Sequence, residues 1–281
     1  MEHKMETEKI VYGPVKSRRL GQSLGINLTP SELKTCNFSC GYCRVGVPSK
    51  GNFETEDFEK YEWTPGNIKR AITTGLEDHA RRETPVDYIT LAGNGEPTLY
   101  PWFGEIIDHL LEERKKYLPD KPTALFTNST TLDQRAIKES IYRLDRRFFK
   151  LDAGDERAFR RTNMPIGVDY EKIIQNLLSL TNYELSMAIT NGDFPNYESF
   201  FDSRFLENLK KMQFTRLFLY DIDIPRTTSP RFNKKVSKEK LENLAEFFSE
   251  QLDKNIGEDI VILWEPTLRN ANIPLYPLQL N

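Results

Sequence analysis

The amino-acid sequence predicts an α/β fold built on parallel strands, and three features lead to that expectation. Short runs rich in Ile, Leu, Phe, Tyr and Thr alternate along the chain with longer amphipathic segments. Six such strand-then-helix units follow one another, which implies parallel strands joined by right-handed crossovers. The length of 281 residues suits a single barrel domain. An α/β barrel, complete or partial, is therefore the favoured architecture, and an open doubly wound sheet is the alternative.

Six short apolar runs are the expected strands. Their lengths and their content of β-branched and aromatic residues are typical of buried strands. They cover residues 23–28, 86–93, 123–128, 147–153, 184–190 and 215–223. A further apolar run, "IVILW" at 260–264, is expected to form a packed C-terminal strand.

Between these runs lie segments with helical periodicity. The segment 101–116 has Phe103, Ile106, Ile107 and Leu110 at helical spacing, which gives it one apolar face. The segment 237–254 begins with Ser237, a residue favoured at helix N-caps. Helices are predicted at 101–116, 169–180 and 237–254, with weaker patterns at 64–82, 132–144 and 198–212.

Small polar or acidic residues follow each of the six predicted strands. Because the carboxyl ends of parallel strands meet at one rim, the loops that carry these residues are expected to form a single working face. The loops are the segment with the cysteines, 93–99, 127–130, 151–159, 190–196 and 221–228.

Composition and charge limit the class of protein. The chain has 39 basic and 42 acidic residues, a net charge of −3, whereas nonspecific nucleic-acid binding usually needs a basic excess. The first residues are polar, and no apolar run resembles a signal peptide or reaches the length of a membrane helix. We therefore expect a cytoplasmic protein without a membrane partner, in a reducing compartment where disulfides are rare.

All three cysteines, Cys36, Cys40 and Cys43, lie within eight positions. A structural zinc site normally uses four ligands, and a distant histidine would have to supply the fourth. Reactive or simply buried thiols would not explain why three lie in one glycine-containing loop. An iron–sulfur cluster uses all three, and a [4Fe–4S] cluster with three thiolates keeps one iron open to another ligand.

The cysteine segment "CNFSCGYC" resembles the CxxxCxxC signature of the radical S-adenosylmethionine (SAM) superfamily. The segment "GNGEP" is similar to the GGE motif of that superfamily, and the barrel matches its partial (βα)6 TIM-like fold. The stretches "YGPVKSRRLGQSLGINL", "LAGNGEPTLYP", "FKLDAGDERAFRRTNMP" and "FLYDID" resemble stand-alone radical SAM oxidoreductases related to the tRNA wybutosine-synthesis enzymes. This resemblance spans residues 11 to 230.

The resemblance implies roles for the cofactors and for individual residues. In this superfamily SAM chelates the open iron of a [4Fe–4S] cluster, one electron cleaves SAM, and the resulting 5′-deoxyadenosyl radical abstracts a hydrogen atom from the substrate. Carried over, Cys36, Cys40 and Cys43 would hold the cluster, and Tyr42 would lie against the adenine. An electron donor of the flavodoxin or ferredoxin type would be required.

Further SAM contacts are implied at the ends of the second, third and fourth predicted strands. The motif Asn94–Gly95–Glu96 would approach the methionine amino group, since a carboxylate facing an ammonium forms a charge-assisted hydrogen bond. Asn128 and Asp152 are candidates for ribose or carboxylate contacts. Lys150, which alternation places on the same strand face as Asp152, would neutralise the SAM carboxylate.

Each of these residues also has a purely structural interpretation. "GNGEP" has ordinary turn chemistry, and aspartates that follow strands commonly cap the next helix. The aspartates to which this applies are Asp152, Asp155, Asp221 and Asp223. Asn191 and Asn196 are interpreted as turn residues, and Trp264 and Glu265 as part of the C-terminal strand region rather than the site.

The substrate is the least determined part of the prediction. A small molecule or peptide is favoured over nucleic acid because the chain has an acidic balance, although residues 143–161 carry seven basic and four acidic residues. The alternatives are an enzyme that modifies tRNA and a non-catalytic iron–sulfur or zinc protein. The chain lacks the additional cysteines that wybutosine enzymes use for a second cluster. No catalytic residue is assigned, and oxidoreductase, lyase and transferase chemistry all stay open.

The domain prediction is a single radical SAM domain over residues 1–281. Within it, residues 1–22 are expected to form an N-terminal extension and residues 23–230 the barrel core. Residues 231–281 are expected to supply a C-terminal helix and strand that close the barrel.

Overall fold

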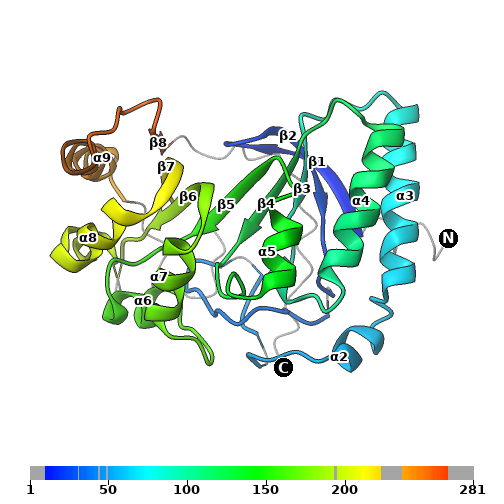
Figure 1. The fold of residues 1–281 in the computed structure, drawn as a ribbon, viewed down its shortest axis with the longest axis horizontal. Helices are drawn as coiled ribbons and strands as arrows, with labels where there is room; N and C mark the ends of the chain where they lie inside the picture. The colour runs from blue at the N-terminus through cyan, green and yellow to red at the C-terminus, as the bar shows by residue number, and fades with distance from the viewer. Residues whose placement is uncertain are drawn as a thin grey trace.

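One mixed sheet organises the protein (Figure 1). The computed structural model describes residues 10–30, 32–43, 45–48, 50–192, 195–222 and 236–264. Within them eight strands pair in chain order from β1 to β8, with only β1 and β2 antiparallel. The strands are β1 (Val11–Ser17), β2 (Gly21–Ile26), β3 (Tyr88–Leu91), β4 (Thr123–Thr127), β5 (Arg146–Lys150), β6 (Thr181–Ile189), β7 (Gln213–Asp221) and β8 (Ile260–Leu263).

The six predicted strands are β2 to β7. In a doubly wound sheet the strand order reverses direction at one point, whereas here the strands lie side by side in chain order. This order confirms the predicted partial (βα)6 TIM-like barrel. The strand expected at 260–264 is β8. Strand β1 was not predicted. It contains Gly13 and Pro14, which disrupt the usual strand pattern, and Pro is tolerated here because β1 is an edge strand.

The predicted helices are all present, with ends that differ by a few residues. Ser237 caps α9 as predicted, because its hydroxyl accepts a hydrogen bond from Lys240 N. The helices are α2 (Thr55–Glu59), α3 (Pro65–Arg81), α4 (Phe103–Tyr117), α5 (Arg135–Ile141), α6 (Glu156–Thr162), α7 (Tyr170–Leu178), α8 (Ser203–Lys211) and α9 (Lys238–Leu252), with 3-10 turns η1 (Pro97–Leu99) and η2 (Tyr197–Phe201). Helices α2 and α6 were not predicted, since each is too short to show a periodic apolar face. Among the helices described, none has the length and apolar character needed to span a bilayer.

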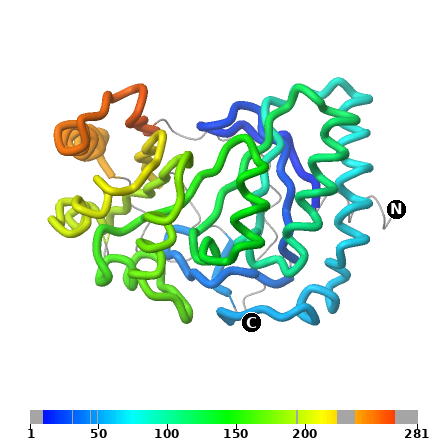
Figure 2. Tube along the Cα trace, viewed as in Figure 1, coloured from blue at the N-terminus to red at the C-terminus, as the bar shows by residue number. Residues whose placement is uncertain are grey.

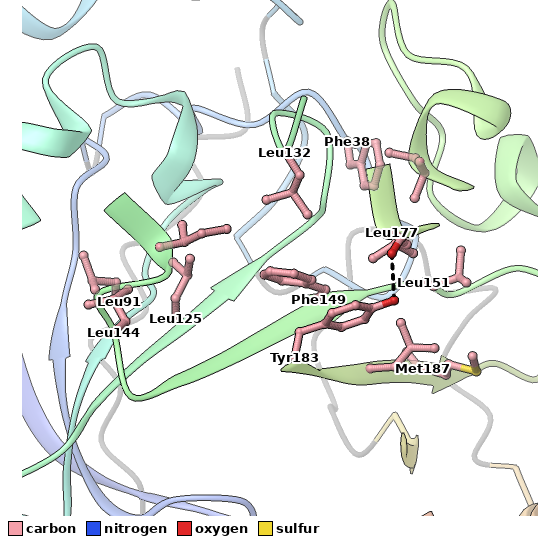
Figure 3. Close-up of a cluster of buried hydrophobic side chains, with 14 of the residues drawn as sticks. Phe38, Leu91, Leu125, Leu132, Leu144, Phe149, Leu151, Leu177, Tyr183 and Met187 are labelled. Carbon is pink, nitrogen blue, oxygen red and sulfur yellow. Dashed lines mark hydrogen bonds between the residues drawn. The ribbon is translucent and has the colours of Figure 1, made fainter. Parts of the chain in front are cut away.

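The two faces of the sheet have different environments. Because neighbouring side chains on a strand point to opposite faces, Phe149 packs with the helices while Phe148 lies on the inner face. The helix-facing core is the larger cluster, and Figure 3 shows part of it, with Tyr183 donating a hydrogen bond to Leu177 O. It also includes Phe38 from the cysteine loop (Figure 3). The loop is therefore anchored in the same core as the strands.

The turn between β1 and β2 approaches the other edge of the sheet. In Figure 2 this dark-blue turn points toward the orange-red end of the described chain, where β8 lies. Arg18 makes the connection: Nη1 donates to Asp221 Oδ1 and to Leu263 O, each at 2.9 Å. An arginine thus links the first strand pair to β7 and β8 across the open side of the partial barrel.

Candidate active site

The cysteine loop is held against the chain that leaves α6. Backbone hydrogen bonds join Ser39 N to Met164 O at 3.2 Å, Gly41 N to Thr162 O at 3.1 Å, and Ile166 N to Asn37 O at 2.9 Å. Phe38 packs edge-on against Phe159 of α6, with ring centroids 5.4 Å apart. These contacts fix the loop at the carboxyl ends of the strands, where the sequence placed the working face.

Each of the three sulfurs accepts a hydrogen bond from nitrogen. Cys36 Sγ accepts hydrogen bonds from Phe38 N at 3.4 Å and from Asn128 Nδ2 at 3.8 Å. Cys40 Sγ accepts a hydrogen bond from Asn163 Nδ2 at 3.4 Å, and Cys43 Sγ accepts one from Val45 N at 3.4 Å. Donors of this kind stabilise a thiolate and tune the potential of an iron–sulfur cluster.

The burial and spacing of the thiols bear on which metal group they could hold. Burial raises the pKa of Cys36 and of Cys40, and the positive charge of a bound metal would favour their thiolate forms. Within the described part of the chain, no three His, Cys, Asp or Glu side chains converge on one point that could hold a metal ion. Cluster thiolates bind different iron atoms and need not converge. The donor set therefore fits a cluster held by three cysteines, and the ligand assignment stays a prediction.

The loop after β3 contacts the cysteine loop directly. Glu96 N donates to Thr35 O at 2.8 Å, and a Cβ atom on Gly95 would lie 2.0 Å from the same oxygen. Asn94 N donates to Asn27 Oδ1 at 3.1 Å, which ties this loop to the end of β2. The "GNGEP" motif is thus a tight turn, as its composition indicates, and it also supports the residue before Cys36.

The Glu96 carboxylate is buried and accepts four hydrogen bonds. Oε1 accepts Thr98 N at 3.1 Å, Thr98 Oγ1 at 2.6 Å and Thr127 Oγ1 at 2.7 Å. Oε2 accepts one bond, from Asn128 N at 2.6 Å. Burial nevertheless raises the pKa of Glu96, against the lowering effect of these donors. Glu96 caps η1 and joins it to β4, and Oε2 keeps capacity for a further donor.

Replacing Gly95 by alanine is expected to displace the cysteine loop. The added methyl group would meet a backbone carbonyl, which cannot rotate away as a side chain could. We expect a loss of about 1–3 kcal/mol in the free energy of unfolding, together with reduced iron uptake. The matched control is Gly66→Ala in the first turn of α3, where nothing lies within 4 Å of the new methyl. Equal stability of the two variants in denaturant titrations would contradict this account.

A network of buried polar groups lies beside Cys40. Asp152 Oδ2 accepts a hydrogen bond from Tyr42 and forms an ion pair of 3.0 Å with Lys150 Nζ, while Oδ1 accepts Ala188 N at 2.7 Å. Asn163 Nδ2 lies 3.1 Å from both Tyr42 Oη and Asp152 Oδ2. The predicted residues Tyr42, Lys150 and Asp152 are therefore in contact, and Asn163 joins them to the sulfur of Cys40.

Charge in this network is balanced by pairing. Burial alone lowers the pKa of Lys150, but the Asp152 carboxylate and Tyr220 outweigh it, so the pKa is raised and the ammonium stays charged. Burial and the adjacent Asp152 raise the pKa of Tyr42, which keeps the phenol protonated as a donor. Asp152 is consequently held by the Lys150 cation and by three hydrogen-bond donors, Tyr42, Asn163 and Ala188 N, and it does not cap a helix.

Asn128 connects the loop after β3 with the cysteine loop. Its backbone nitrogen binds Glu96, while its side-chain nitrogen contacts Cys36 Sγ and donates to Asn37 Oδ1 at 2.8 Å. Asn37 in turn donates to Thr130 Oγ1 at 3.0 Å. Both the motif after β3 and the cysteine loop therefore depend on the residue at the end of β4.

The other polar residues after the strands have structural roles where the structure describes them. Asp155 caps α6 by accepting Ala158 N at 2.7 Å. Asn196 is fully buried and donates to Asp152 O and Ala188 O, each at 2.7 Å. Asn191 accepts a hydrogen bond from the next residue within its turn. Asp221 pairs with Arg18, and Trp264 donates to Val236 O at 3.5 Å; Asp223 and Glu265 lie outside the described residues.

Asn37 and Asn163 were not predicted as site residues. Asn37 lies between Cys36 and Cys40, at a position where the cysteine motif allows any residue. The sequence therefore does not indicate its hydrogen bond with Asn128. Asn163 follows α6 in "RRTNMP", within a stretch that carries the family resemblance. Tertiary packing alone brings them to the site.

The chain matches a family model and several curated proteins. The model described as Radical SAM superfamily matches residues 33–203. A UPF0026 protein of Helicobacter pylori strain J99 is 35% identical over 176 residues, which cover 63% of this chain and 53% of that protein. A UPF0026 protein of Methanocaldococcus jannaschii is 26% identical over 274 residues, covering 90% of this chain and 81% of its own. The chain thus spans about half the length of the Helicobacter relative.

Two solved structures share the fold at low sequence identity. A structure of TYW1 with a lysine–pyruvate adduct bound aligns with a TM-score of 0.54 at 16% identity, covering 87% of this chain and 76% of that one. A radical SAM methyltransferase from Sphaerobacter thermophilus aligns with a TM-score of 0.54 at 11% identity, covering 86% and 66%. At these identities the likeness concerns the arrangement of the strands and helices.

Proposed function

This chain belongs to the Radical SAM superfamily, whose family model matches residues 33–203, and from that premise we propose that it is an enzyme that cleaves SAM reductively and abstracts a hydrogen atom from a small-molecule or peptide substrate. Cys36, Cys40 and Cys43 would hold a [4Fe–4S] cluster. When bound, that cluster supplies the electron that cleaves SAM. The carrying observation is that each of the three sulfurs accepts an N–H donor at the carboxyl rim of the sheet.

The chain's own residues would bind and orient SAM around these sulfurs. Glu96 Oε2, which accepts a single hydrogen bond, retains capacity for the methionine ammonium. Lys150 Nζ contacts Asp152 and Tyr220 and so has a third N–H for the SAM carboxylate. Tyr42 would lie against the adenine, with Asn94, Gly95 and Asn128 at the edges of the same site. Such a buried set of groups would exclude water and hold the reacting atoms close together.

Lys150 is proposed as a fixed charge and not as a nucleophile. The TYW1 structure named above holds a lysine–pyruvate adduct, and a lysine that attacks a carbonyl must first lose its proton. Lys150 is paired with Asp152 at 3.0 Å and donates to Tyr220 Oη at 2.8 Å. Both contacts favour the ammonium form and so support an electrostatic role.

A small molecule or peptide is proposed over nucleic acid because of where the basic residues lie. Arg146 forms an ion pair with Glu184, Arg147 is buried and donates to backbone oxygens, and Lys150 pairs with Asp152. Three of the seven basic residues of 143–161 therefore face the protein interior. Modification of tRNA would need a basic surface built from other residues.

An anaerobic assay tests this function. The protein is reconstituted with iron and sulfide, reduced with dithionite in place of a flavodoxin or ferredoxin, and incubated with SAM. We expect 5′-deoxyadenosine from the wild-type protein and about background amounts from a Cys43→Ala variant, because one cluster ligand is lost. A fully loaded, reducible cluster that binds no SAM would contradict the proposal, as would a protein that takes up zinc but no iron.

A further inference from the structure

A cluster of cations lies on the inner face of the sheet, deeper than the cysteine loop. Arg18 and Arg19 come from the turn between β1 and β2, and Lys150 comes from the end of β5. All three approach the ring of Tyr220 on β7, with distances to its centroid of 5.9 Å from Arg18 Cζ, 4.3 Å from Arg19 Cζ and 5.5 Å from Lys150 Nζ. Like charges this close repel one another unless carboxylates compensate them.

Two of these cations have a carboxylate partner, and the third has none among the described residues. Arg18 pairs with Asp221 at 2.9 Å and Lys150 with Asp152 at 3.0 Å, and both carboxylates are fully buried. Arg19 Nη2 donates to the hydroxyl of Ser186 at 3.2 Å, and its guanidinium also interacts with the neutral hydroxyl of Tyr220. The Arg19 Nε atom is buried without a hydrogen-bond partner in the described structure. A buried N–H donor without an acceptor costs free energy, and an anion that accepted from Arg19 Nε would remove that cost.

Aromatic rings hold Arg19 in place without neutralising it. Its Cζ lies 5.4 Å from the Phe126 ring centroid, 6.0 Å from Phe148 and 5.9 Å from Phe218. Contacts between a cation and ring faces fix the position of the guanidinium but leave its N–H groups available. The planar fork of an arginine so presented matches a carboxylate or phosphate in a bidentate manner.

Arg19 lies at a different depth along the strands from the expected iron–sulfur cluster. The rings of Phe126, Phe148 and Phe218 each lie two residues before Asn128, Lys150 and Tyr220 on the same strands. Two residues of a strand rise about 7 Å. Asn128 is the residue that contacts Cys36. The Arg19 guanidinium lies between the three phenylalanine rings and the Tyr220 ring, and so on the side of Tyr220 that faces away from the cysteine loop.

We infer that Arg19, with Ser186 beside it and the charge of Lys150 above it, forms a subsite for an oxyanion carried by the substrate, which is therefore an anionic small molecule with a carboxylate or phosphate group. The anion would complete the hydrogen bonds of Arg19 and reduce the repulsion among the three cations around Tyr220. Arg18 and Arg19 both belong to the basic run "KSRR" at residues 16–19. Calling this anion the substrate rests on the proposed function, while the anion site itself does not.

Calorimetric titration of the full chain without iron or SAM tests the subsite. The probes are inorganic phosphate and malonate, each at constant ionic strength so that general screening is matched. We expect saturable binding of at least one probe to the wild-type protein and a loss of at least about tenfold in affinity in Arg19→Gln. Arg160→Gln is the matched control, because Arg160 is exposed and pairs with Glu156 on the surface. It should bind within about twofold of the wild-type protein.

The outcomes separate the possible occupants. Binding of phosphate alone identifies a phosphorylated substrate class, and binding of malonate alone a carboxylate. Should Arg19→Gln fail to fold, Arg19→Lys keeps the cation without the fork and is expected to weaken binding similarly, while Ser186→Ala should weaken it less. No binding to the wild-type protein, or equal binding in Arg19→Gln, overturns the inference.

A parallel loss of SAM affinity in the reconstituted Arg19 variant would also overturn it, since Arg19 would then hold the SAM carboxylate. Because the titration uses protein without a cluster, its failure leaves the assay of SAM cleavage unaffected.

Discussion

Replacing Cys40 by alanine is expected to lower iron incorporation from about four atoms per chain to fewer than about one. Cys40 is 7% exposed and accepts a hydrogen bond from Asn163, and the methyl group of alanine cannot bind iron in place of its sulfur. The loop itself should stay in place, because Gly41 N binds Thr162 O and Cys43 N binds Cys40 O through the backbone. Iron and sulfide analysis after anaerobic reconstitution measures the effect, and circular dichroism checks that the fold is retained.

The control for this variant is Ser39→Ala. Ser39 is in the same loop and half-buried, and its recorded contact is made by its backbone nitrogen to Met164 O. It should take up as much iron as the wild-type protein. Equal iron content in the Cys40 and Ser39 variants would exclude Cys40 as a cluster ligand.

Replacing Lys150 by methionine is expected to lower the free energy of unfolding by about 3 kcal/mol. The substitution keeps most of the packing volume but leaves the Asp152 carboxylate, which is fully buried, without its cation. Tyr42 and Ala188 would still donate to Asp152, so the effect should fall at the lower end for a broken buried ion pair. Equilibrium unfolding in urea, on protein without a cluster, measures the change.

The comparison for this variant is the surface pair Arg135–Glu139, whose side chains are 92% and 63% exposed. Arg135→Met is expected to leave the free energy of unfolding close to that of the wild-type protein, because solvent screens an exposed ion pair. If both variants lose the same free energy of unfolding, the buried Lys150–Asp152 pair stabilises the protein no more than an exposed pair does. A Lys150→Met protein as stable as the wild type would show that Asp152 becomes protonated at little cost once the ammonium is gone.

The fold was predictable where local pattern and tertiary structure agree. The runs that became β2 to β7 are short and apolar because both faces of a barrel strand are covered, and α4 and α7 show their core-facing stripe in the sequence. Strand β1 was missed because Gly13 and Pro14 interrupt it and the polar residues Lys16 and Ser17 end it, so it does not resemble a buried strand. Helix α6 was missed because it has only seven residues. The prediction failed at an edge strand and at short elements, where local pattern carries least information.

The candidate site was predictable only from residues whose chemistry is unusual in the sequence. Three cysteines in one loop are conspicuous, and so are polar residues directly after strands, such as Asp152 and Asn128. Nothing local marks Asn163 as a neighbour of Cys40, or Arg19 as an inner-face residue in contact with Ser186. These contacts join positions separated by more than 100 residues, so only the folded sheet brings them together.

The attachment of the cysteine loop to residues 162–166 bears on how the protein is made. Synthesis proceeds from the N-terminus, so Cys36, Cys40 and Cys43 leave the ribosome well before Thr162, Met164 and Ile166, whose backbone groups hold the loop. Asn163, the donor to Cys40, arrives at the same late stage. The nascent cysteines are therefore exposed and unorganised until more than half of the chain has emerged. Iron and sulfide would therefore be delivered best after residues 162–166 have emerged, because metal that arrives earlier would meet three loose thiols rather than a prepared site.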